Sequence, residues 1–385
     1  MAEPRIVLAG GGTAGHVNPL LALAEELRRR HPGGRLLALG TATGLEAELI
    51  PAAGIELAEL PRVPLPRRPS MDVLRFPGRW RRAVAAAEAA ISGTGGEGKA
   101  DAVVGFGGYV ATPAYIAARR AGVPVVVHEQ NARPGLANRL GARFASAVAV
   151  TFAGTKLPGA TVVGLPLRSA IADLVAARAA DPAAARRNGA AALNLDPDRP
   201  VLLVTGGSLG AARINGSLAA AAVDLLATGA QVLHLAGAGK DDDTRRAVHE
   251  VTAAAGVAAD DYRVLSYLDD MQHGLACADL VVGRAGAGTV CELAALGIPA
   301  VYVPLPIGNG EQRLNASGVV SAGGGVLVAD ADLTPEWVRQ HVAPLLSDTA
   351  RLRAMGQRAS AVGVRDGAAR LADLVERVIA TGNRL

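Results

Sequence analysis

The sequence predicts an α/β protein of two domains, each built on a parallel sheet that helices cover. Short apolar runs alternate along the chain with segments whose apolar residues recur at helical spacing. Both halves begin alike, with a strand, a glycine turn and a helix near residues 5–27 and 199–226. Half of the 385 residues are apolar and only 3% are aromatic, as expected for Ala, Val and Leu cores around parallel strands. The length also favours at least two domains.

The first domain begins with a predicted strand at Arg5–Ala9, a glycine turn and a helix with leucines on one face. Glycines 10, 12 and 15 match the G-x-G-x-x-G pattern of dinucleotide sites. The next predicted strand, Arg35–Leu39, ends in Gly40-Thr41 and lacks the acid that would bind a ribose. An NAD-dependent oxidoreductase is therefore disfavoured.

Two further strands of this domain precede candidate ligand-binding turns. One begins at Asp101 and runs into a glycine turn, and another, Val123–Val127, runs into His128-Glu-Gln-Asn131. Polar side chains at the carboxyl end of a buried strand face the ligand crevice of a doubly wound sheet. The alternative is that they only bond loop backbone.

The second domain repeats the order of strand, glycine turn and helix. It follows a helical linker, rich in Ala, Asp and Arg, between about residues 168 and 200. A glycine turn precedes a helix predicted from about residue 212 to 226, and Thr334-Pro335 marks a later helix start. An amphipathic helix at about Gly367–Ala380 ends the chain. Strands are predicted at Gln231–Leu235, Tyr262–Leu265, Leu280–Val282 and Ala300–Val303.

The stretch Gly283–Ala316 carries the clearest binding signal. Small residues where its helix should begin leave backbone N–H groups uncovered, which suits an anion. Thr289, Glu292 and the polar cluster Glu311, Gln312 and Asn315 follow, so we predict a site for a nucleotide that carries a sugar. The alternative is a capping box, in which Thr289 and Glu292 satisfy only their own helix.

Composition excludes several classes of protein. Cys277 and Cys291 cannot form a disulfide framework, and no Cys/His spacing matches a zinc site. Asp241-Asp-Asp243 reads as a helix-start charge cluster, so we predict no metal and no cofactor. The N-terminus lacks the features of a signal peptide, and no apolar run reaches the roughly 18 residues of a membrane span. We expect a soluble or peripheral protein of a reducing cytoplasm.

Charge is concentrated in one segment. Seven arginines and a single acid lie between Arg62 and Arg82, although the whole chain carries only +4. This segment is either a solvated loop or a basic and apolar patch that rests on an anionic membrane surface; nucleic acid is the weaker choice. The membrane patch would comprise Arg67, Arg68, Leu74, Arg75, Phe76, Arg79, Trp80 and Arg82.

Six motifs taken together resemble the MurG family of bacterial transferases. They are GGGTAGH at 10–16, GFGGYVATP at 105–113, HEQNARPGLANR at 128–139, GGSLGA at 206–211, RAGAGTVCE at 284–292 and EQRLNA at 311–316. Members of that family move N-acetylglucosamine (GlcNAc) from UDP-GlcNAc to lipid I and form lipid II, a peptidoglycan precursor. The resemblance implies a GT-B fold, two Rossmann-like domains facing a cleft. It also implies a first domain of residues 1–168 with a returning helix at about 366–385, and a second of residues 169–365.

The resemblance also implies which residues bind the donor. Ser208 and Thr289 would hold the diphosphate, Glu292 the ribose, and Leu268 the uracil through its backbone, while Gln312 would read the GlcNAc hydroxyls. The full UDP-GlcNAc set is Thr13, Ala14, Gly15, Asn131, Arg168, Ser208, Leu268, Ala287, Gly288, Thr289, Val290, Cys291, Glu292 and Gln312. Ala14, Leu165 and Leu209 depart from the commonest family pattern, and we assign no side-chain role to positions 165 and 209.

The acceptor side would be shaped by the turn Thr13–His16 together with Gly107, Gly108, Tyr109 and Asn138. His16 is the predicted catalytic base, because the dipole of the helix that it starts disfavours its protonated form. His128 and Glu129 are the alternatives. Helix N-termini after the glycine turns would stabilise the leaving UDP without metal, so we predict an inverting single displacement.

The predicted partners are UDP-GlcNAc, lipid I and the anionic cytoplasmic face of the cell membrane, on which the protein would be peripheral. Other cell-wall enzymes are possible partners. A UDP-GlcNAc epimerase, which shares the twin-Rossmann shape, and a non-catalytic UDP-sugar-binding protein remain rival interpretations.

Overall fold

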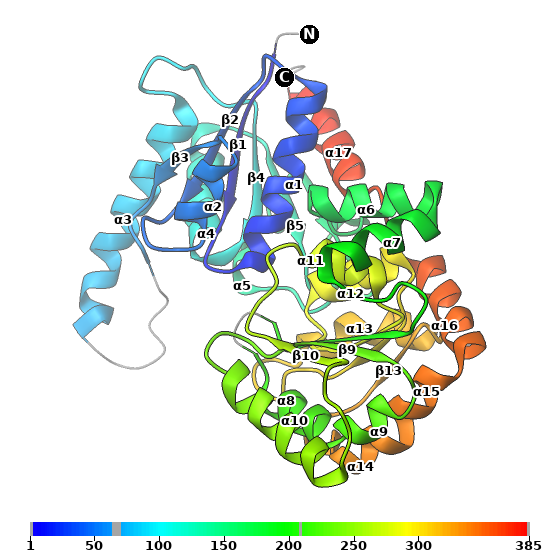
Figure 1. Ribbon diagram of the computed structural model, residues 1–385. Helices are drawn as coiled ribbons and strands as arrows, with labels where there is room; N and C mark the ends of the chain where they lie inside the picture. The colour runs from blue at the N-terminus through cyan, green and yellow to red at the C-terminus, as the bar shows by residue number, and fades with distance from the viewer. Residues whose placement is uncertain (1–2, 64–70, 208–209, 383–385) are drawn as a thin grey trace. The chain divides into compact units, whose positions relative to one another are not determined.

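The computed structural model describes residues 3–63, 71–207 and 210–382. The chain forms two compact units, one of Met1–Arg168 with Asp366–Leu385 and the other of Ser169–Arg365. Each unit is a parallel sheet with helices on both faces (Figure 1), which confirms the predicted α/β class with two Rossmann-like domains.

The first unit contains a seven-stranded parallel sheet in the order β3-β2-β1-β4-β5-β6-β7. Its central strands are buried on both faces, so they read as continuous Val, Leu and Ala runs. The strands are β1 (Arg5–Gly10), β2 (Arg35–Gly40), β3 (Glu56–Glu59), β4 (Ala102–Gly107), β5 (Val125–Glu129), β6 (Ala147–Val150) and β7 (Ala160–Val162).

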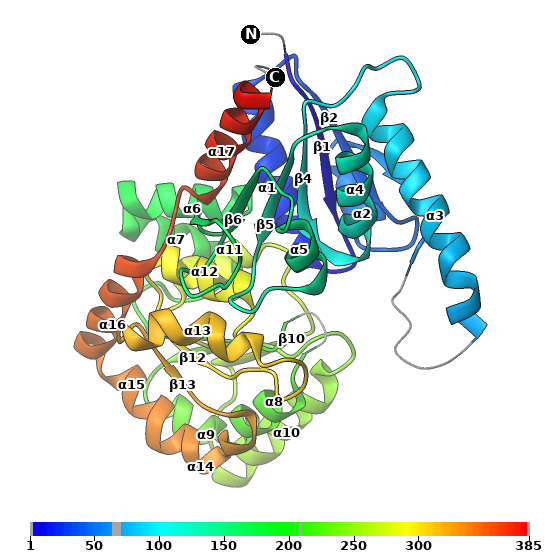
Figure 2. The ribbon, with the colours of Figure 1, turned by 180° about the vertical axis from the view of Figure 1, so that it is seen from behind.

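Helices of the first unit pack in two layers. Those on one face are α1 (Ala14–Arg30), α2 (Glu46–Ala52) and α17 (Gly367–Gly382). Those on the other are α3 (Met71–Ser92) and α4 (Gly108–Ala121), and the short α5 (Leu136–Gly141) follows β5. The last helix, α17, lies beside α1 in both views (Figures 1 and 2). Arg30 of α1 joins them, with Nη1 2.6 Å from Asp373 and 3.1 Å from Glu376.

The second unit contains a six-stranded parallel sheet in the order β10-β9-β8-β11-β12-β13. Its strands are β8 (Val201–Thr205), β9 (Gln231–Leu235), β10 (Tyr262–Leu265), β11 (Leu280–Gly283), β12 (Ala300–Tyr302) and β13 (Gly325–Leu327). Its helices are α6 (Ser169–Ala180), α7 (Pro182–Leu193), α8 (Ala212–Ala220), α9 (Ala222–Leu226), α10 (Asp241–Ala255), α11 (Met271–Cys277), α12 (Ala287–Leu296), α13 (Glu311–Ser321), α14 (Pro335–Trp337), α15 (Ala343–Ser347) and α16 (Thr349–Val362). A 3₁₀ turn (Asp330–Asp332) and a π-helical segment (Val338–Val342) complete the unit.

Several local predictions are confirmed and others are wrong in detail. Thr334 caps α14 by accepting a hydrogen bond from the Trp337 N–H, as predicted. The single helix expected from about residue 212 to 226 is two helices, broken at Ala221. Four strands were missed, namely β3, β6, β7 and β13, each of which lies at an edge of its sheet or next to one.

The order of strands fixes where each unit can bind a ligand. The chain reverses its direction across the sheet between β1 and β4 in the first unit, and between β8 and β11 in the second. In open parallel sheets, ligands bind outside the carboxyl ends of the strands at such a switch point. The glycine turns after β1, β4, β8 and β11 all lie there, so each unit presents one candidate site.

Candidate active site

His16 lies in the first turn of α1, directly after the glycine turn of β1. Its Nδ1 is 3.1 Å from the carbonyl oxygen of Gly11 and 3.0 Å from Oγ1 of Thr13. Because a carbonyl only accepts, Nδ1 carries the proton and the neutral ring keeps a lone pair on Nε2. Burial lowers the pKa of His16, against the opposing effects of the Gly11 hydrogen bond and the Glu46 carboxylate. The ring is therefore neutral near pH 7 and can accept a proton at Nε2.

Glu46, at the start of α2, is a site residue that sequence reasoning missed. Its side chain is buried, and its carboxylate accepts hydrogen bonds from the Gly12 N–H at 2.8 Å and the Thr41 hydroxyl at 2.7 Å. Burial favours the neutral acid, but the hydrogen bonds outweigh it and lower the pKa of Glu46. The sequence shows no acid at the end of β2, and this one reaches back from six residues beyond that end. It lines a cavity of about 470 Å³ together with the Gly11–Gly12 turn and Tyr109.

The turn between β4 and α4 approaches His16 from the neighbouring strand. Gly107 has φ 99° and ψ −167°, and a Cβ there would lie 3.2 Å from Nε2 of His16. Gly108 has φ +81°, and its Cβ would lie only 2.4 Å from the Gly11 carbonyl oxygen. Both positions require glycine, because the backbone is left-handed and the space is already filled. The first unit thus brings its two predicted glycine turns together around His16.

His128, one of the two alternative bases, is fully buried at the end of β5. Its Nε2 is 3.0 Å from the Gly164 carbonyl oxygen, so Nε2 carries the proton, and Nδ1 is 3.0 Å from Nε2 of Gln130. Burial lowers the pKa of His128 to about 4. Both ring nitrogens have partners, so this histidine holds the structure of the strand end and we no longer propose it as the base.

Glu129, the second alternative, is also buried and fully engaged. Its carboxylate accepts hydrogen bonds of 2.9 Å from the Asn131 and Gly135 N–H groups and from Nδ2 of Asn138. Asn138 in turn accepts a hydrogen bond from the Tyr115 hydroxyl and is itself buried. Glu129 and Asn138 therefore shape the loop after β5, in which Asn131 is partly exposed.

In the second unit, α12 starts directly after the turn of β11. Its N-cap is Gly286, which makes no side-chain capping bond, and Thr289 is the third residue of the helix. The alternative capping-box interpretation is therefore wrong. The N–H groups of Ala287, Gly288 and Thr289 donate to no residue within the described part of the chain. They form the uncovered helix N-terminus that an anion would occupy.

Gln312 of α13 lies against the same turn. Its Oε1 accepts hydrogen bonds from the N–H groups of Ala285 at 3.2 Å and Leu305 at 3.0 Å. This orientation leaves Nε2 as a donor with no partner among residues 3–63, 71–207 and 210–382. Arg284 ties the turn from the other side, with Nη1 2.6 Å from Asp330. The loop is therefore rigidly held, and Gln312 presents an amide donor beside it.

The remaining residues predicted to bind the donor differ in their exposure to solvent. Ser208, like Leu209, lies outside the described residues, in the turn that follows β8. Leu268 is partly exposed after β10, Glu292 and Cys291 are partly exposed on α12, and Arg168 is partly exposed at the end of the first unit. Val290 points into the core and is only 3% exposed, so its side chain cannot contact a ligand. Thr13, Ala14 and Gly15 are exposed at the start of α1.

The basic segment coincides with the first half of α3. Arg67 and Arg68 lie outside the described residues, as do the side chains of Leu74 and Arg75. The rings of Phe76 and Trp80 stack with centroids 6.1 Å apart. Trp80 also packs on the core beneath α3, so its ring is partly a structural element and not only a surface group. Arg82 is exposed and Arg79 partly exposed.

The described residues offer neither a cluster of metal ligands nor a membrane-spanning helix. No three His, Cys, Asp or Glu side chains in the described ranges gather as a set of metal ligands. Asp241–Asp243 form the first turn of α10 and pair with Arg245 and Arg246, which confirms the helix-start interpretation. Among the helices in the described ranges, none combines the length and the apolar character needed to cross a membrane.

Residues 6–150 match the N-terminal domain of glycosyltransferase family 28, and residues 201–371 match its C-terminal domain. The chain belongs to glycosyltransferase family 28. It is thus a glycosyltransferase, and the resemblance to MurG enzymes is confirmed by its relatives.

Two relatives carry the name "UDP-N-acetylglucosamine--N-acetylmuramyl-(pentapeptide) pyrophosphoryl-undecaprenol N-acetylglucosamine transferase". The protein from Clavibacter sepedonicus is 56% identical over 376 residues, which are 97% of this chain and 96% of the relative. That from Bifidobacterium longum (strain DJO10A) is 51% identical over 381 residues, 95% of each chain. The crystal structure of Acinetobacter baumannii MurG has a TM-score of 0.77 at 29% identity, covering 97% of this chain and 99% of that one.

The rival epimerase shares only the fold with this family 28 enzyme. A putative UDP-N-acetylglucosamine 2-epimerase from Listeria monocytogenes gives a TM-score of 0.68 at 15% identity, over 96% of this chain and 95% of that one. The named transferases share more than half of their residues with the chain across nearly its full length. The epimerase and the oxidoreductase are therefore set aside.

Proposed function

We propose that this family 28 enzyme transfers GlcNAc from UDP-GlcNAc to the 4-hydroxyl of MurNAc in lipid I, giving lipid II and UDP. The observation that carries the proposal is the 56% identity, over 97% of the chain, to a transferase named for this reaction. The geometry of the two switch-point sites supports it, because one suits a diphosphate and the other holds a neutral histidine.

The donor binds, in this proposal, at the start of α12. The unpartnered N–H groups of Ala287, Gly288 and Thr289 and the positive end of the helix dipole face the diphosphate. Gln312 uses its free Nε2 to donate to a GlcNAc hydroxyl, since its Oε1 is already bound by the loop. Glu292, one turn further along α12, accepts from the ribose. Ser208 lies outside the described residues, and its contact with the diphosphate stays a prediction.

The acceptor reacts by a single displacement at the anomeric carbon. The MurNAc O4 attacks C1 of GlcNAc on the face opposite the diphosphate, so the O4–C1 bond forms as the bond from C1 to the diphosphate breaks. The configuration at C1 inverts. Nε2 of His16 takes the proton of the hydroxyl, and UDP leaves with the bonding electrons, stabilised by the N–H groups of α12.

No metal ion or other cofactor takes part in this proposal. The developing negative charge on the diphosphate is balanced by fixed N–H groups and by the dipole of α12, which need no reorganisation during the reaction. Activity should therefore persist in excess EDTA, and a requirement for added Mg²⁺ or Mn²⁺ would contradict this part.

The lipid-linked acceptor implies work at the cytoplasmic face of the membrane. We place α3 there as a peripheral contact, with Arg79 and Arg82 facing anionic headgroups and Phe76 at the boundary of the acyl chains. Each basic residue near such a surface contributes on the order of 1 kcal/mol. Reversing Arg79 and Arg82 to Glu should release the enzyme from phosphatidylglycerol vesicles, whereas reversing the exposed Arg143 of the same unit should not. Equal binding by both variants would contradict the placement.

One assay tests the reaction itself. UDP release and product are followed from UDP-GlcNAc with and without a lipid I analogue, in EDTA. We expect UDP release only with the acceptor, together with a disaccharide product. Binding of UDP-GlcNAc without release would indicate a non-catalytic protein, and a changed sugar nucleotide without acceptor would indicate an epimerase. His16→Ala should lower turnover by about 10²–10⁴-fold; near wild-type turnover would remove His16 from its role.

A further inference from the structure

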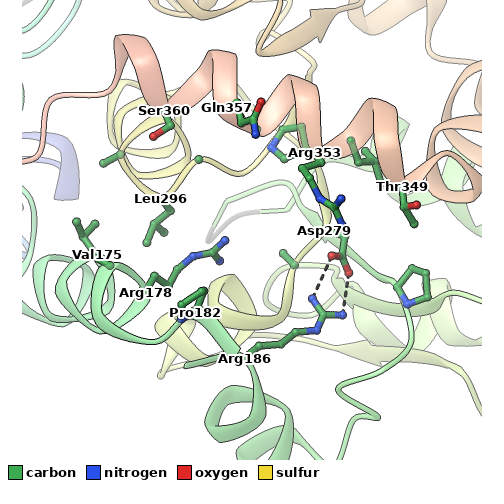
Figure 3. A pocket seen from close by; sticks show the side chains of 18 of the residues that line it. Val175, Arg178, Pro182, Arg186, Asp279, Leu296, Thr349, Arg353, Gln357 and Ser360 are labelled. Carbon is green, nitrogen blue, oxygen red and sulfur yellow. Dashed lines mark hydrogen bonds and ion pairs between the residues drawn. The ribbon is translucent and has the colours of Figure 1, made fainter. Parts of the chain in front are cut away.

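An arginine-rich cavity of about 890 Å³ lies in the second unit, between α6, α7, the end of α12 and α16 (Figure 3). It opens at the amino-terminal edge of the sheet, since its walls include Pro200, Asp279 and Pro299, which directly precede β8, β11 and β12. The donor loops follow the carboxyl ends of the same strands. At about 3.3 Å per residue the two edges are on the order of 10 Å or more apart. The cavity is thus separate from the proposed donor site.

Two of its arginines are neutralised by acids. Arg186 of α7 holds Asp279 with two hydrogen bonds, of 3.1 and 2.9 Å (dashed in Figure 3), and donates to three backbone carbonyls as well. Arg199 is paired with Asp261 at 2.7 Å. These two guanidinium groups brace the wall and have little capacity left for a ligand.

Arg178 and Arg353, in contrast to Arg186 and Arg199, form no ion pair with a described residue. Arg178 of α6 has no carboxylate partner in the described part of the chain, and its one hydrogen bond, to the Leu275 carbonyl, is 3.4 Å long. It is partly buried, and burial lowers its pKa against the opposing effect of the nearby Asp279 carboxylate. Arg353 of α16 makes no hydrogen bond or ion pair with any described residue. Figure 3 shows both side chains reaching into the space between the two helices.

The rest of the lining is compatible with an anion. Thr349, Arg353 and Gln357 follow one another at intervals of four residues, so they share the face of α16 that borders the cavity. Arg365 is held by the Ala295 carbonyl and the Ser360 hydroxyl. Asp279 is already bound by Arg186, and the other lining acid, Asp198, is an exposed residue.

We infer that this cavity binds a small soluble phosphorylated anion, held mainly by Arg178 and Arg353. A guanidinium fork matches two phosphate oxygens, which gives charge-assisted hydrogen bonds in a fixed geometry. The Asp279 carboxylate is already paired with Arg186 and only partly offsets the burial of Arg178, so a bound phosphate would offset the remaining cost. Thr349 and Gln357 of α16 supply neutral hydrogen bonds to the same ligand. The ligand joins α6 to α16.

The test is calorimetric titration with inorganic pyrophosphate in the presence of saturating UDP. UDP keeps the donor loops occupied, so remaining heat belongs to a second site. Arg178→Ala and Arg353→Ala should each weaken binding at least about tenfold, the loss expected for one hydrogen bond to a charged group. Arg351→Ala, at an exposed position of the same helix outside the cavity, is the matched control and should bind as wild type.

Arg353 is exposed and makes no hydrogen bond or ion pair with the described residues, so its replacement should leave the unfolding temperature nearly unchanged, and weaker binding can then be assigned to the lost guanidinium. Absence of pyrophosphate binding, or equal weakening by Arg351→Ala, would overturn the inference. The test compares pyrophosphate binding by the Arg353 and Arg351 variants. This comparison remains valid even if the protein fails to bind UDP. A second arm uses phosphatidylglycerol vesicles, to which Arg353→Ala should bind as wild type; an effect on vesicles without one on pyrophosphate would refute a soluble ligand.

Discussion

Gly107→Ala places a methyl group against the proposed reacting atom of His16. The methyl would lie 3.2 Å from Nε2 of His16 and 3.3 Å from Nδ2 of Asn138. The backbone at φ 99° and ψ −167° is in a region that only glycine adopts easily, which costs about 1–3 kcal/mol for alanine. At about 2–4 °C per kcal/mol for a unit of this size, the unfolding temperature should fall by about 2–12 °C.

The catalytic loss should exceed what this strain alone produces. A methyl beside Nε2 keeps an acceptor hydroxyl out of hydrogen-bonding reach, so the contribution of a general base, about 10²–10⁴-fold in rate, is lost. This corresponds to about 3–5 kcal/mol in the barrier. Initial rates of UDP release with a lipid I analogue, measured well below both unfolding temperatures, report the change in kcat/KM.

Gly54→Ala is the matched control. Gly54 has φ +70° in the same unit, and the nearest atom to its Cβ is Arg28 Nη1 at 3.9 Å, so the change adds backbone strain without a clash. It should lower the unfolding temperature and leave kcat/KM unchanged. If Gly107→Ala is destabilised but keeps kcat/KM within about threefold of Gly54→Ala, then Nε2 of His16 is not the atom that takes the proton.

Three further predictions concern pH and packing. Because the pKa of His16 is lowered, the midpoint of the acid limb of the kcat/KM profile should lie below 6.5, the ordinary pKa of a histidine. Glu46→Gln removes a charge that raises this pKa and should move that midpoint lower; an upward move in the pH–rate profile would contradict this. Burial lowers the pKa of His234 to about 3 from 6.5, so the unfolded state binds the proton first and stability falls as pH drops from 6.5 toward 3, by about 2 kcal/mol at pH 5. Urea unfolding at pH 7 and pH 5 should show a smaller pH effect in His234→Gln, and an unchanged one would disprove the assignment. Arg30→Ala should loosen α17 by about 1–2 kcal/mol, seen as faster proteolysis at the C-terminus, while the 70% exposed Arg29→Ala should not; equal sensitivity would show that the ion pairs do not hold α17.

Sequence reasoning predicted the parts of the fold whose signal lies in residues that are close together in the sequence. A strand, a glycine turn and a helix occupy neighbouring residues, so their apolar period and turn chemistry identify β1 with α1 and β11 with α12 before any contact is known. The uncovered N–H groups at Ala287–Thr289 follow from the same local pattern. The edge strand β13, whose short run begins with a glycine, was missed, and it is defined by its pairing with β12.

Roles that depend on tertiary contacts could not be predicted. His128 and Glu129 were expected to face a ligand because they end a strand. Instead, residues 131–138 bind the Glu129 carboxylate, and Gly164 and Gln130 bind the ring of His128. Glu46 carries no local sequence signal that marks it as a site residue. Only the return of α2 toward β1 brings its carboxylate to the Gly12 N–H. In each case the role of the residue depends on whether its side chain is buried. Hydrophobic periodicity cannot predict the burial of a single polar residue.

The two switch-point turns look alike in sequence, yet their electrostatics are opposite. In the first unit the Gly12 N–H is bound by the protein's own carboxylate, so a buried negative charge lies where a dinucleotide fold would place phosphate. That charge disfavours a diphosphate and favours the imidazolium that forms when His16 takes a proton. In the second unit the N–H groups at Ala287–Thr289 have no such occupant within the described chain. The proposed division of roles, with the donor in the second unit and proton transfer in the first, agrees with this position of the Glu46 carboxylate.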